Sequence, residues 1–164
     1  MSEVQSMKRD SLALLRHYRL IWDSVRYEPG KLVVVAYDRE GHPAMSDSVC
    51  TAGQPYRLVA TVDKSSVCAN GTEYAFVQLK VVDRQGNLCP DSSERIRFRV
   101  DGCGEFVASA NGDPTDLNPF HISEMPVFHG QLMAIVRGNG RVGEFLFEAS
   151  ADGLLPCKIK IKTK

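Results

Sequence analysis

The stretch from Asn70 to Pro114 constrains the fold more than any other part of the sequence, because it holds two segments with a period of two. In the second segment, residues 95–100, arginines alternate strictly with apolar residues. In the first segment every second residue is apolar: Ala75, Val77, Leu79 and Val81. This period places one face of a segment in a core and the other in water, and it predicts two β-strands.

Turn signals separate these segments, since Gly86 can take a positive φ and Asp83 or Asn87 can bond the local backbone. Seven short strands with Gly-rich turns are typical of an immunoglobulin-like sandwich. They are predicted from Tyr56 onward, at 56–62, 74–83, 94–100, 104–109, 131–137, 143–149 and 155–162. The sequence therefore predicts an all-β fold, with an immunoglobulin-like β-sandwich at residues 56–164. Its predicted core includes Val77, Leu79, Phe98, Phe145 and Phe147.

A smaller β unit is predicted ahead of the sandwich. Residues 1–17 are expected to be a tail or a cut end. Strands are predicted at 18–22, 31–37 and about 43–51, and a Gly- and Pro-containing break at 52–55 marks the domain boundary. Residues 18–55 thus form a partial β domain whose few strands leave an open edge. We expect this unit to pack on the sandwich or to pair with a second copy of the chain.

The composition argues against two classes of partner. The chain of 164 residues has a formal net charge of zero, whereas nucleic acid or an anionic membrane surface would favour a basic excess. No apolar run approaches the roughly 20 residues of a membrane span. The apolar run after Lys8 and Arg9 is too short for a signal-peptide core, so a signal for an exported protein would lie outside this sequence. Neither nucleic acid nor a membrane is expected as a partner.

The cysteines predict neither a disulfide framework nor a zinc site. Their number is odd, their spacing is wide, and no Cys-x-x-Cys occurs. We expect five reduced, unpaired thiols, at Cys50, Cys68, Cys89, Cys103 and Cys157.

The residues considered as possible metal ligands lie in one long irregular stretch, Ala110 to Gly130. Their spacing matches neither an EF-hand nor a helical histidine pair, so we expect solvated loop residues and no metal or cofactor: Asp113, Asp116, His121, Glu124 and His129. No nucleophile motif of a hydrolytic triad is present. A sugar-stacking platform is conceivable near the N-terminus, although core or rim aromatics of a sheet are the favoured interpretation of Trp22, Tyr18, Tyr27 and Tyr37.

The same loop is predicted to be a contact surface, because a compact sandwich does not need so long a connection to close a hairpin. Its prolines lower the entropy lost on ordering, which suits a preformed docking surface. Its apolar residues are expected to be exposed: Leu117, Phe120, Met125, Val127 and Phe128. The predicted interface residues are Asn111, Gly112, Asp113, Pro114, Phe120 and Phe128. The alternative, a loop that packs on the end of its own sandwich, stays open.

Two sets of segments resemble known proteins. The first comprises residues 19–32, 35–38 and 51–55, and the second comprises residues 75–77, 82–87, 111–115, 128–130 and 149–154. The first set resembles the region behind the catalytic barrel of glycoside hydrolase family 2 β-galactosidases, the Bacteroides type in particular. The second resembles the C-terminal immunoglobulin-like domain of the same enzymes. Together they cover about residues 18–155 in the family's order, and the Asn-Gly-Asp-Pro-Thr run at 111–115 is among the more specific matches.

The resemblance implies a parent hydrolase rather than a catalytic chain. Family catalysis uses two glutamates about 5 Å apart, at the mouth of a barrel of about 250 residues. This chain has no room for a barrel and no catalytic motif, so no catalytic residue carries over. The implied role is a non-catalytic accessory region that packs against and shapes the catalytic domain of its own parent chain. The resemblance also implies a periplasmic or secreted parent, with carbohydrate and a second copy of the fragment as further expected partners.

Two alternative functions stay open from the sequence. The order Asn-Gly, then Ala-x-Val-x-Leu-x-Val-x-Asp, then Gly-Asn also resembles invasin- or adhesin-type bacterial immunoglobulin-like repeats. The second alternative hypothesis is a carbohydrate-binding module, and an aromatic row on a solvent-facing sheet surface would favour it.

Overall fold

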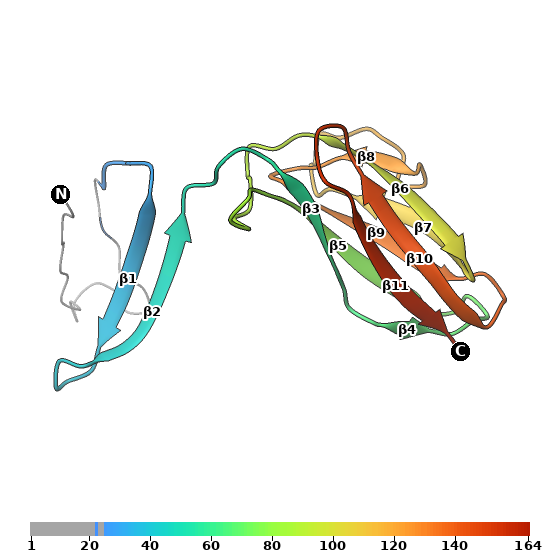
Figure 1. Cartoon of the computed structure of the whole chain (residues 1–164), viewed down its shortest axis with the longest axis horizontal. Helices are drawn as coiled ribbons and strands as arrows, with labels where there is room; N and C mark the ends of the chain where they lie inside the picture. The colour runs from blue at the N-terminus through green and yellow to red at the C-terminus, as the bar shows by residue number, and fades with distance from the viewer. Residues whose placement is uncertain (1–21, 23–24) are drawn as a thin grey trace. The chain divides into compact units, whose positions relative to one another are not determined.

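The computed structural model describes residues 22 and 25–164, and its regular elements in that part of the chain are all β-strands (Figure 1). Contacts divide the chain between Val49 and Cys50 into two compact units. In the described residues no helix is long and apolar enough to cross a membrane. The fold is therefore all-β, as the sequence predicts.

The first unit contains a two-stranded sheet made of β1 (Lys31–Tyr37) and β2 (Pro43–Cys50). These strands confirm the predictions at 31–37 and 43–51. The strand predicted at 18–22 and the tail at 1–17 lie outside the described residues, apart from Trp22, which is half-buried and not in a strand. Tyr27 and Tyr37, expected as core or rim aromatics, are exposed.

The second unit is a sandwich of two sheets (Figure 1). One sheet has five strands in the order β4-β11-β10-β6-β8, and the other has four in the order β3-β5-β9-β7. The strands are β3 (Arg57–Val62), β4 (Ser66–Val67), β5 (Tyr74–Val82), β6 (Arg95–Gly102), β7 (Gly104–Ala110), β8 (Glu124–Pro126), β9 (Gln131–Gly138), β10 (Gly143–Ser150) and β11 (Cys157–Thr163).

The core lies between the two sheets, and the period of two decides which side chains enter it. Within β10, Phe147 pairs with Ile159 of β11 and with Val100 of β6. Its ring lies 6.0 Å from that of Phe98, which stacks on Phe106 at 5.4 Å. All five predicted core residues are buried, which confirms the assignment of strand faces: Val77, Leu79, Phe98, Phe145 and Phe147.

Two strands were not predicted, and one of them lies inside the stretch expected to be irregular. β8 pairs with β6, where Ile96 faces Met125 and Arg97 faces Glu124. β4 has two residues and pairs in parallel with β11. Both strands are too short to show a period of two, so alternation could not reveal them.

The outer face of the five-stranded sheet carries pairs of opposite charges, three of them between neighbouring strands and one between β6 and the turn after β10. Exposed ion pairs contribute little to stability. Their charges make this face of the sheet hydrophilic. The pairs and their N–O distances are Arg97–Asp152 at 2.5 Å, Lys158–Glu148 at 3.3 Å, Lys160–Glu144 at 3.3 Å and Arg95–Glu124 at 3.4 Å.

The five cysteines are free in the structure. Cys50 is exposed, Cys89 is buried, and the others are half-buried. Burial raises the pKa of the Cys157 thiol to about 11, and it also raises the pKa of Cys89. Because the thiolate is the reactive form, these two thiols are held in their unreactive state.

Candidate functional site

The predicted interface loop begins where β7 ends, and the side chain of Asn111 holds its first turn. The Asn111 Oδ1 atom accepts a hydrogen bond from the backbone N–H of Asp113 at 3.0 Å. Its Nδ2 atom donates to Asp116 Oδ2 at 2.7 Å and to the carbonyl of Pro126 at 3.1 Å. Gly112 adopts a φ of 81°, which favours glycine. Asn111 thus ties the start of the loop to β8, near the loop's other end.

Both aspartates of this turn bond locally. Asp113 Oδ1 accepts from the backbone N–H and the hydroxyl of Thr115, at 2.8 and 2.7 Å. Asp116 Oδ1 accepts from the backbone N–H and the Nδ2 of Asn118, at 2.9 and 2.6 Å. The Asn118 N–H, helped by the side chains of Asn111 and Asn118, lowers the pKa of Asp116 because these bonds favour the carboxylate. With Pro114 exposed beside them, these residues form a preformed polar turn.

The apolar residues of the loop divide into two groups, which corrects the expectation that all are exposed. Met125 and Val127 are buried in the sandwich core, because β8 brings this end of the loop against β6. Phe128 is half-buried, with its ring 4.2 Å from that of His129. Leu117 and Phe120 are 96% and 65% exposed. One end of the loop therefore packs on its own sandwich, and its middle presents two apolar side chains to solvent.

The five loop residues considered as metal ligands do not form one cluster. In the described part of the chain, the one set of three such groups with ligand atoms within 4.8 Å of one another is Asp38, Glu40 and His42, in the turn between β1 and β2. Sequence reasoning missed this set, although the spacing Asp-x-Glu-x-His around Gly41 could have revealed it.

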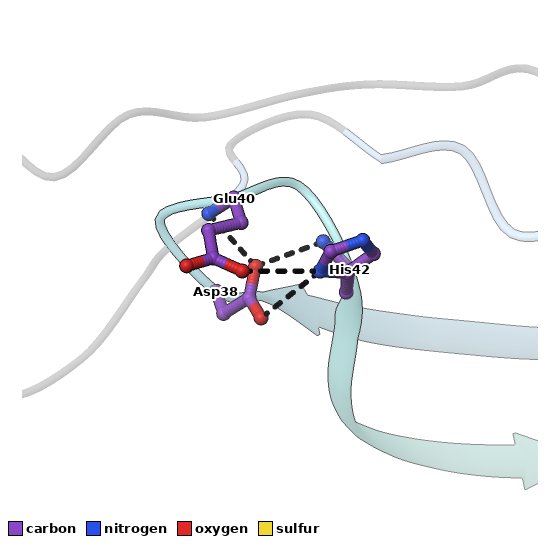
Figure 2. A group of neighbouring side chains, drawn as sticks. All are labelled: Asp38, Glu40 and His42. Atoms are coloured by element: carbon purple, nitrogen blue, oxygen red, sulfur yellow. Dashed lines mark hydrogen bonds and ion pairs between the residues drawn. The ribbon is translucent and has the colours of Figure 1, made fainter.

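Figure 2 shows how this turn holds the three side chains together. Asp38 Oδ1 accepts from the backbone N–H groups of Glu40 and His42, at 2.9 and 2.8 Å. His42 Nδ1 lies 3.6 Å from Asp38 Oδ2 and 3.7 Å from Glu40 Oε2. Carboxylate and imidazole groups are ligand types for divalent cations, but all three side chains are exposed and Asp38 is already committed to the turn. The arrangement is explained by the turn alone.

A buried carboxylate fixes the start of the second unit. Asp83 is 1% exposed, and its Oδ2 accepts from the backbone N–H of Gly53 at 2.8 Å and from Asn87 Nδ2 at 3.0 Å. Its Oδ1 accepts from the backbone N–H groups of Gln85 and Asn87, at 2.9 and 2.8 Å. The Gly53 N–H and then the Asn87 side chain do most to lower the pKa of Asp83 to about 2. Asp83 thus closes the predicted turn at 83–87 and also holds residue 53, thirty positions away.

We expect Asp83→Asn to loosen the segment around Gly53 and to change the response to acid. The carboxamide NH₂ replaces one acceptor, so the Gly53 N–H loses its partner and should exchange faster with solvent. Because the folded pKa of Asp83 lies below its ordinary value, its carboxylate stabilises the native state above about pH 4, and this is lost as pH falls toward 2. Urea unfolding at pH 7 and pH 3 should show a smaller pH dependence in the variant. The exposed Asp91→Asn is the matched control, and an equal effect there would contradict this role of Asp83.

The hairpin of the first unit is exposed along its whole length. Every residue of β1 and β2 is exposed. β1 carries apolar side chains at four successive positions, and because successive side chains point to opposite faces, both faces of the strand are apolar. The exposed apolar residues of the two strands are Leu32, Val33, Val34, Val35, Tyr37, Met45 and Val49.

The chain is similar to several glycoside hydrolases from Bacteroides species. The chain is 31% identical over 160 residues to the β-galactosidase BoGH2A of Bacteroides ovatus, a match that covers 98% of the chain and 18% of that protein. Its fold is similar to a β-glycosidase from Bacteroides vulgatus, with a TM-score of 0.79 and 24% identity over 85% of the chain and 18% of that structure. It is also similar to a glycosyl hydrolase family 2 member from Bacteroides cellulosilyticus, with a TM-score of 0.81, 22% identity and the same coverage.

The chain thus spans 18% of the length of these relatives. Residues 3–44 match a domain of unknown function (DUF4982), which includes β1 and the start of β2. Residues 58–160, nearly the whole sandwich, match the glycoside hydrolase family 2 C-terminal domain 5. With that match, the chain belongs to the C-terminal domains of glycoside hydrolase family 2.

Proposed function

We propose that this chain is a non-catalytic accessory region of a β-galactosidase-like hydrolase of family 2, and that it packs against and shapes the catalytic part of its own parent chain. Family membership of the sandwich and the β-galactosidase named among its relatives support the parent activity. The exposed hairpin β1–β2 carries the packing part of the proposal.

A hairpin of this kind needs another surface to cover its apolar side chains. A strand that is apolar on both faces is typical of a sheet covered on both sides. A two-stranded sheet is marginal in water by itself, and contiguous exposed apolar surface marks an interaction site. In the parent hydrolase, the catalytic part covers this surface. In the isolated chain, the hairpin of a second copy takes its place.

Glutamate substitutions on the two faces of β1 test this contact. Val33→Glu and Val34→Glu should each lower the thermal midpoint of the intact hydrolase and its turnover of a nitrophenyl β-galactoside, because a charge is desolvated at the contact. In light scattering, the isolated chain should shift from dimer toward monomer. Val142→Glu, at an exposed valine of the sandwich, is the control. Hairpin variants that behave like this control would contradict the proposal.

The isolated chain should not hydrolyse a nitrophenyl β-galactoside. Two of its carboxylates that could be suspected of catalysis are held in surface ion pairs, Glu105 with Arg137 at 2.6 Å and Glu124 with Arg95 at 3.4 Å. Turnover by the purified chain that disappears in Glu105→Gln or Glu124→Gln would show that the chain itself is catalytic.

The exposed middle of the loop is a second contact surface for the parent. Leu117 and Phe120 project there from a turn whose hydrogen bonds are already satisfied locally, so docking would cost little conformational entropy. Phe128, half-buried, belongs to the sandwich instead. In the assay on the intact hydrolase, Phe120→Ala should resemble the hairpin variants while leaving the fragment's own stability unchanged.

A further inference from the structure

The outer face of the four-stranded sheet differs from the charged outer face of its partner sheet. Its second strand, β5, exposes two aromatic side chains, Tyr74 at 39% and Phe76 at 42%. Both point outward because the residues that alternate with them, Ala75 and Val77, are fully buried. Residues two apart on a strand share a face, so the two rings follow one another along β5.

The neighbouring strands complete a floor for these rings. Phe76 pairs across the sheet with Ile135 of β9, and Ile135 pairs in turn with Ala108 of β7. Tyr74 pairs with Arg137 of β9 in the same way, and Arg137 pairs with Glu105 of β7. Half-buried apolar side chains therefore lie beside Phe76 on the neighbouring strands, and charged side chains lie beside Tyr74.

The polar groups around the rings are held in place. Arg137 Nε donates to Glu105 Oε1 at 2.6 Å, and the guanidinium also bonds the Tyr74 side chain, so it is held beside the first ring. A guanidinium has five N–H donors, more than these two contacts use. On the other side of Phe76 along β5, Gln78 Nε2 donates a hydrogen bond to Gln131 Oε1 at 3.4 Å. Planar donors and acceptors thus flank the aromatic pair at both ends.

Charge and area decide what kind of ligand fits this face. The charges beside the rings are of both signs: Arg137 pairs with Glu105 and Lys64 with Glu73, and the Asp63 carboxylate accepts from the Phe76 N–H at 2.7 Å. The face therefore does not select an anionic partner. Among the described residues of this sheet, Tyr74 and Phe76 are the large apolar side chains that are exposed. Two rings offer far less apolar surface than the roughly 800 Å² per partner of a stable protein interface. A sugar has the right features, since its C–H face packs on an aromatic ring while its hydroxyls bond amides and guanidinium groups.

We propose that this face binds a neutral oligosaccharide, with Tyr74 and Phe76 as the stacking platform and Gln78, Gln131 and Arg137 as hydrogen-bonding partners of its hydroxyls. The binding face would hold a polysaccharide near the parent enzyme, which is a function distinct from packing against the catalytic part. It does not depend on the hairpin contact proposed above.

The test uses the full 164-residue chain and three defined probes. Amide NMR shifts are followed during titration with β-1,4-galactotetraose, with β-1,4-glucotetraose and with the charged tetragalacturonate. At least one neutral tetrasaccharide should shift resonances of β5 and β9, and tetragalacturonate should bind more weakly. Phe76→Ala should weaken binding about tenfold, the scale of one lost aromatic stacking contact. Phe76→Tyr, which keeps the ring, should retain binding.

Phe120→Ala is the matched control, because it removes an exposed ring from the loop rather than from the sheet. The proposal is overturned if neither neutral probe shifts β5 and β9, if the charged probe binds best, or if Phe120→Ala weakens binding as much as Phe76→Ala. Concentration-dependent dimerisation that Phe76→Ala abolishes, without sugar-induced shifts, would assign the face to a second copy of the chain instead. None of these readouts involves hydrolase activity, so failure here leaves the packing proposal separately testable.

Discussion

Replacing Phe147 by alanine should lower the free energy of unfolding of the sandwich by about 3–5 kcal/mol. The side chain is fully buried in the middle of β10, between β6 and β11, and its ring faces the stacked pair of Phe98 and Phe106. Truncation therefore removes buried apolar area and leaves a cavity that the surrounding core residues only partly close. The loss is large against the 5–15 kcal/mol of a typical domain.

Urea unfolding followed by far-ultraviolet circular dichroism measures this effect. The denaturation midpoint should fall while the slope stays unchanged, since the same surface is exposed on unfolding. Phe120→Ala, which truncates the same kind of side chain at an exposed position, should leave the midpoint almost unchanged. Equal midpoints for Phe147→Ala and the wild type would mean that the core lies elsewhere in the sandwich.

The sequence predicted the strands of the sandwich well because their alternation is governed by burial on one face only. β6 shows why: Ile96 and Phe98 are buried, and the arginines between them are exposed. Alternation assigns faces but carries no information about which strand pairs with which, so the two sheet orders came only from the structure. It also fails for β4 and β8, whose few residues give no period.

The candidate site was predictable where it depends on local chemistry. The turns at 83–87 and 111–116 use Asp, Asn and Gly in positions that short-range rules identify. The bond from Gly53 to Asp83 spans thirty residues and has no local signature. The burial of Met125 likewise depends on pairing with β6, which a proline-containing loop does not reveal. The outward position of Phe76 follows from the alternation, but the polar groups beside it come from other strands.

Changing Gly130 to alanine should destabilise the sandwich by about 3 kcal/mol or more, although it adds only one methyl group. Gly130 has a φ of 71° and follows His129, the non-glycine residue with positive φ in the described chain, at 49°. A left-handed backbone alone costs an alanine about 1–2 kcal/mol. In addition, a Cβ atom at Gly130 would lie 2.2 Å from the carbonyl oxygen of Cys89, a distance that requires the backbone to move.

That movement would be expensive because the backbone around Gly130 joins three segments. The carbonyl of Gly130 accepts from the Val81 N–H at 2.8 Å, and the carbonyl of Val81 accepts from the Cys89 N–H at 3.0 Å. Gly112→Ala separates the two contributions, since Gly112 also has a positive φ of 81° but a Cβ there meets nothing within 4 Å. Gly112→Ala should show the conformational cost alone, so its midpoint in urea should fall between those of the wild type and Gly130→Ala. Equal midpoints for the two alanine variants would mean that the Cys89 backbone yields freely, and that the end of the loop is not fixed where it rejoins β9.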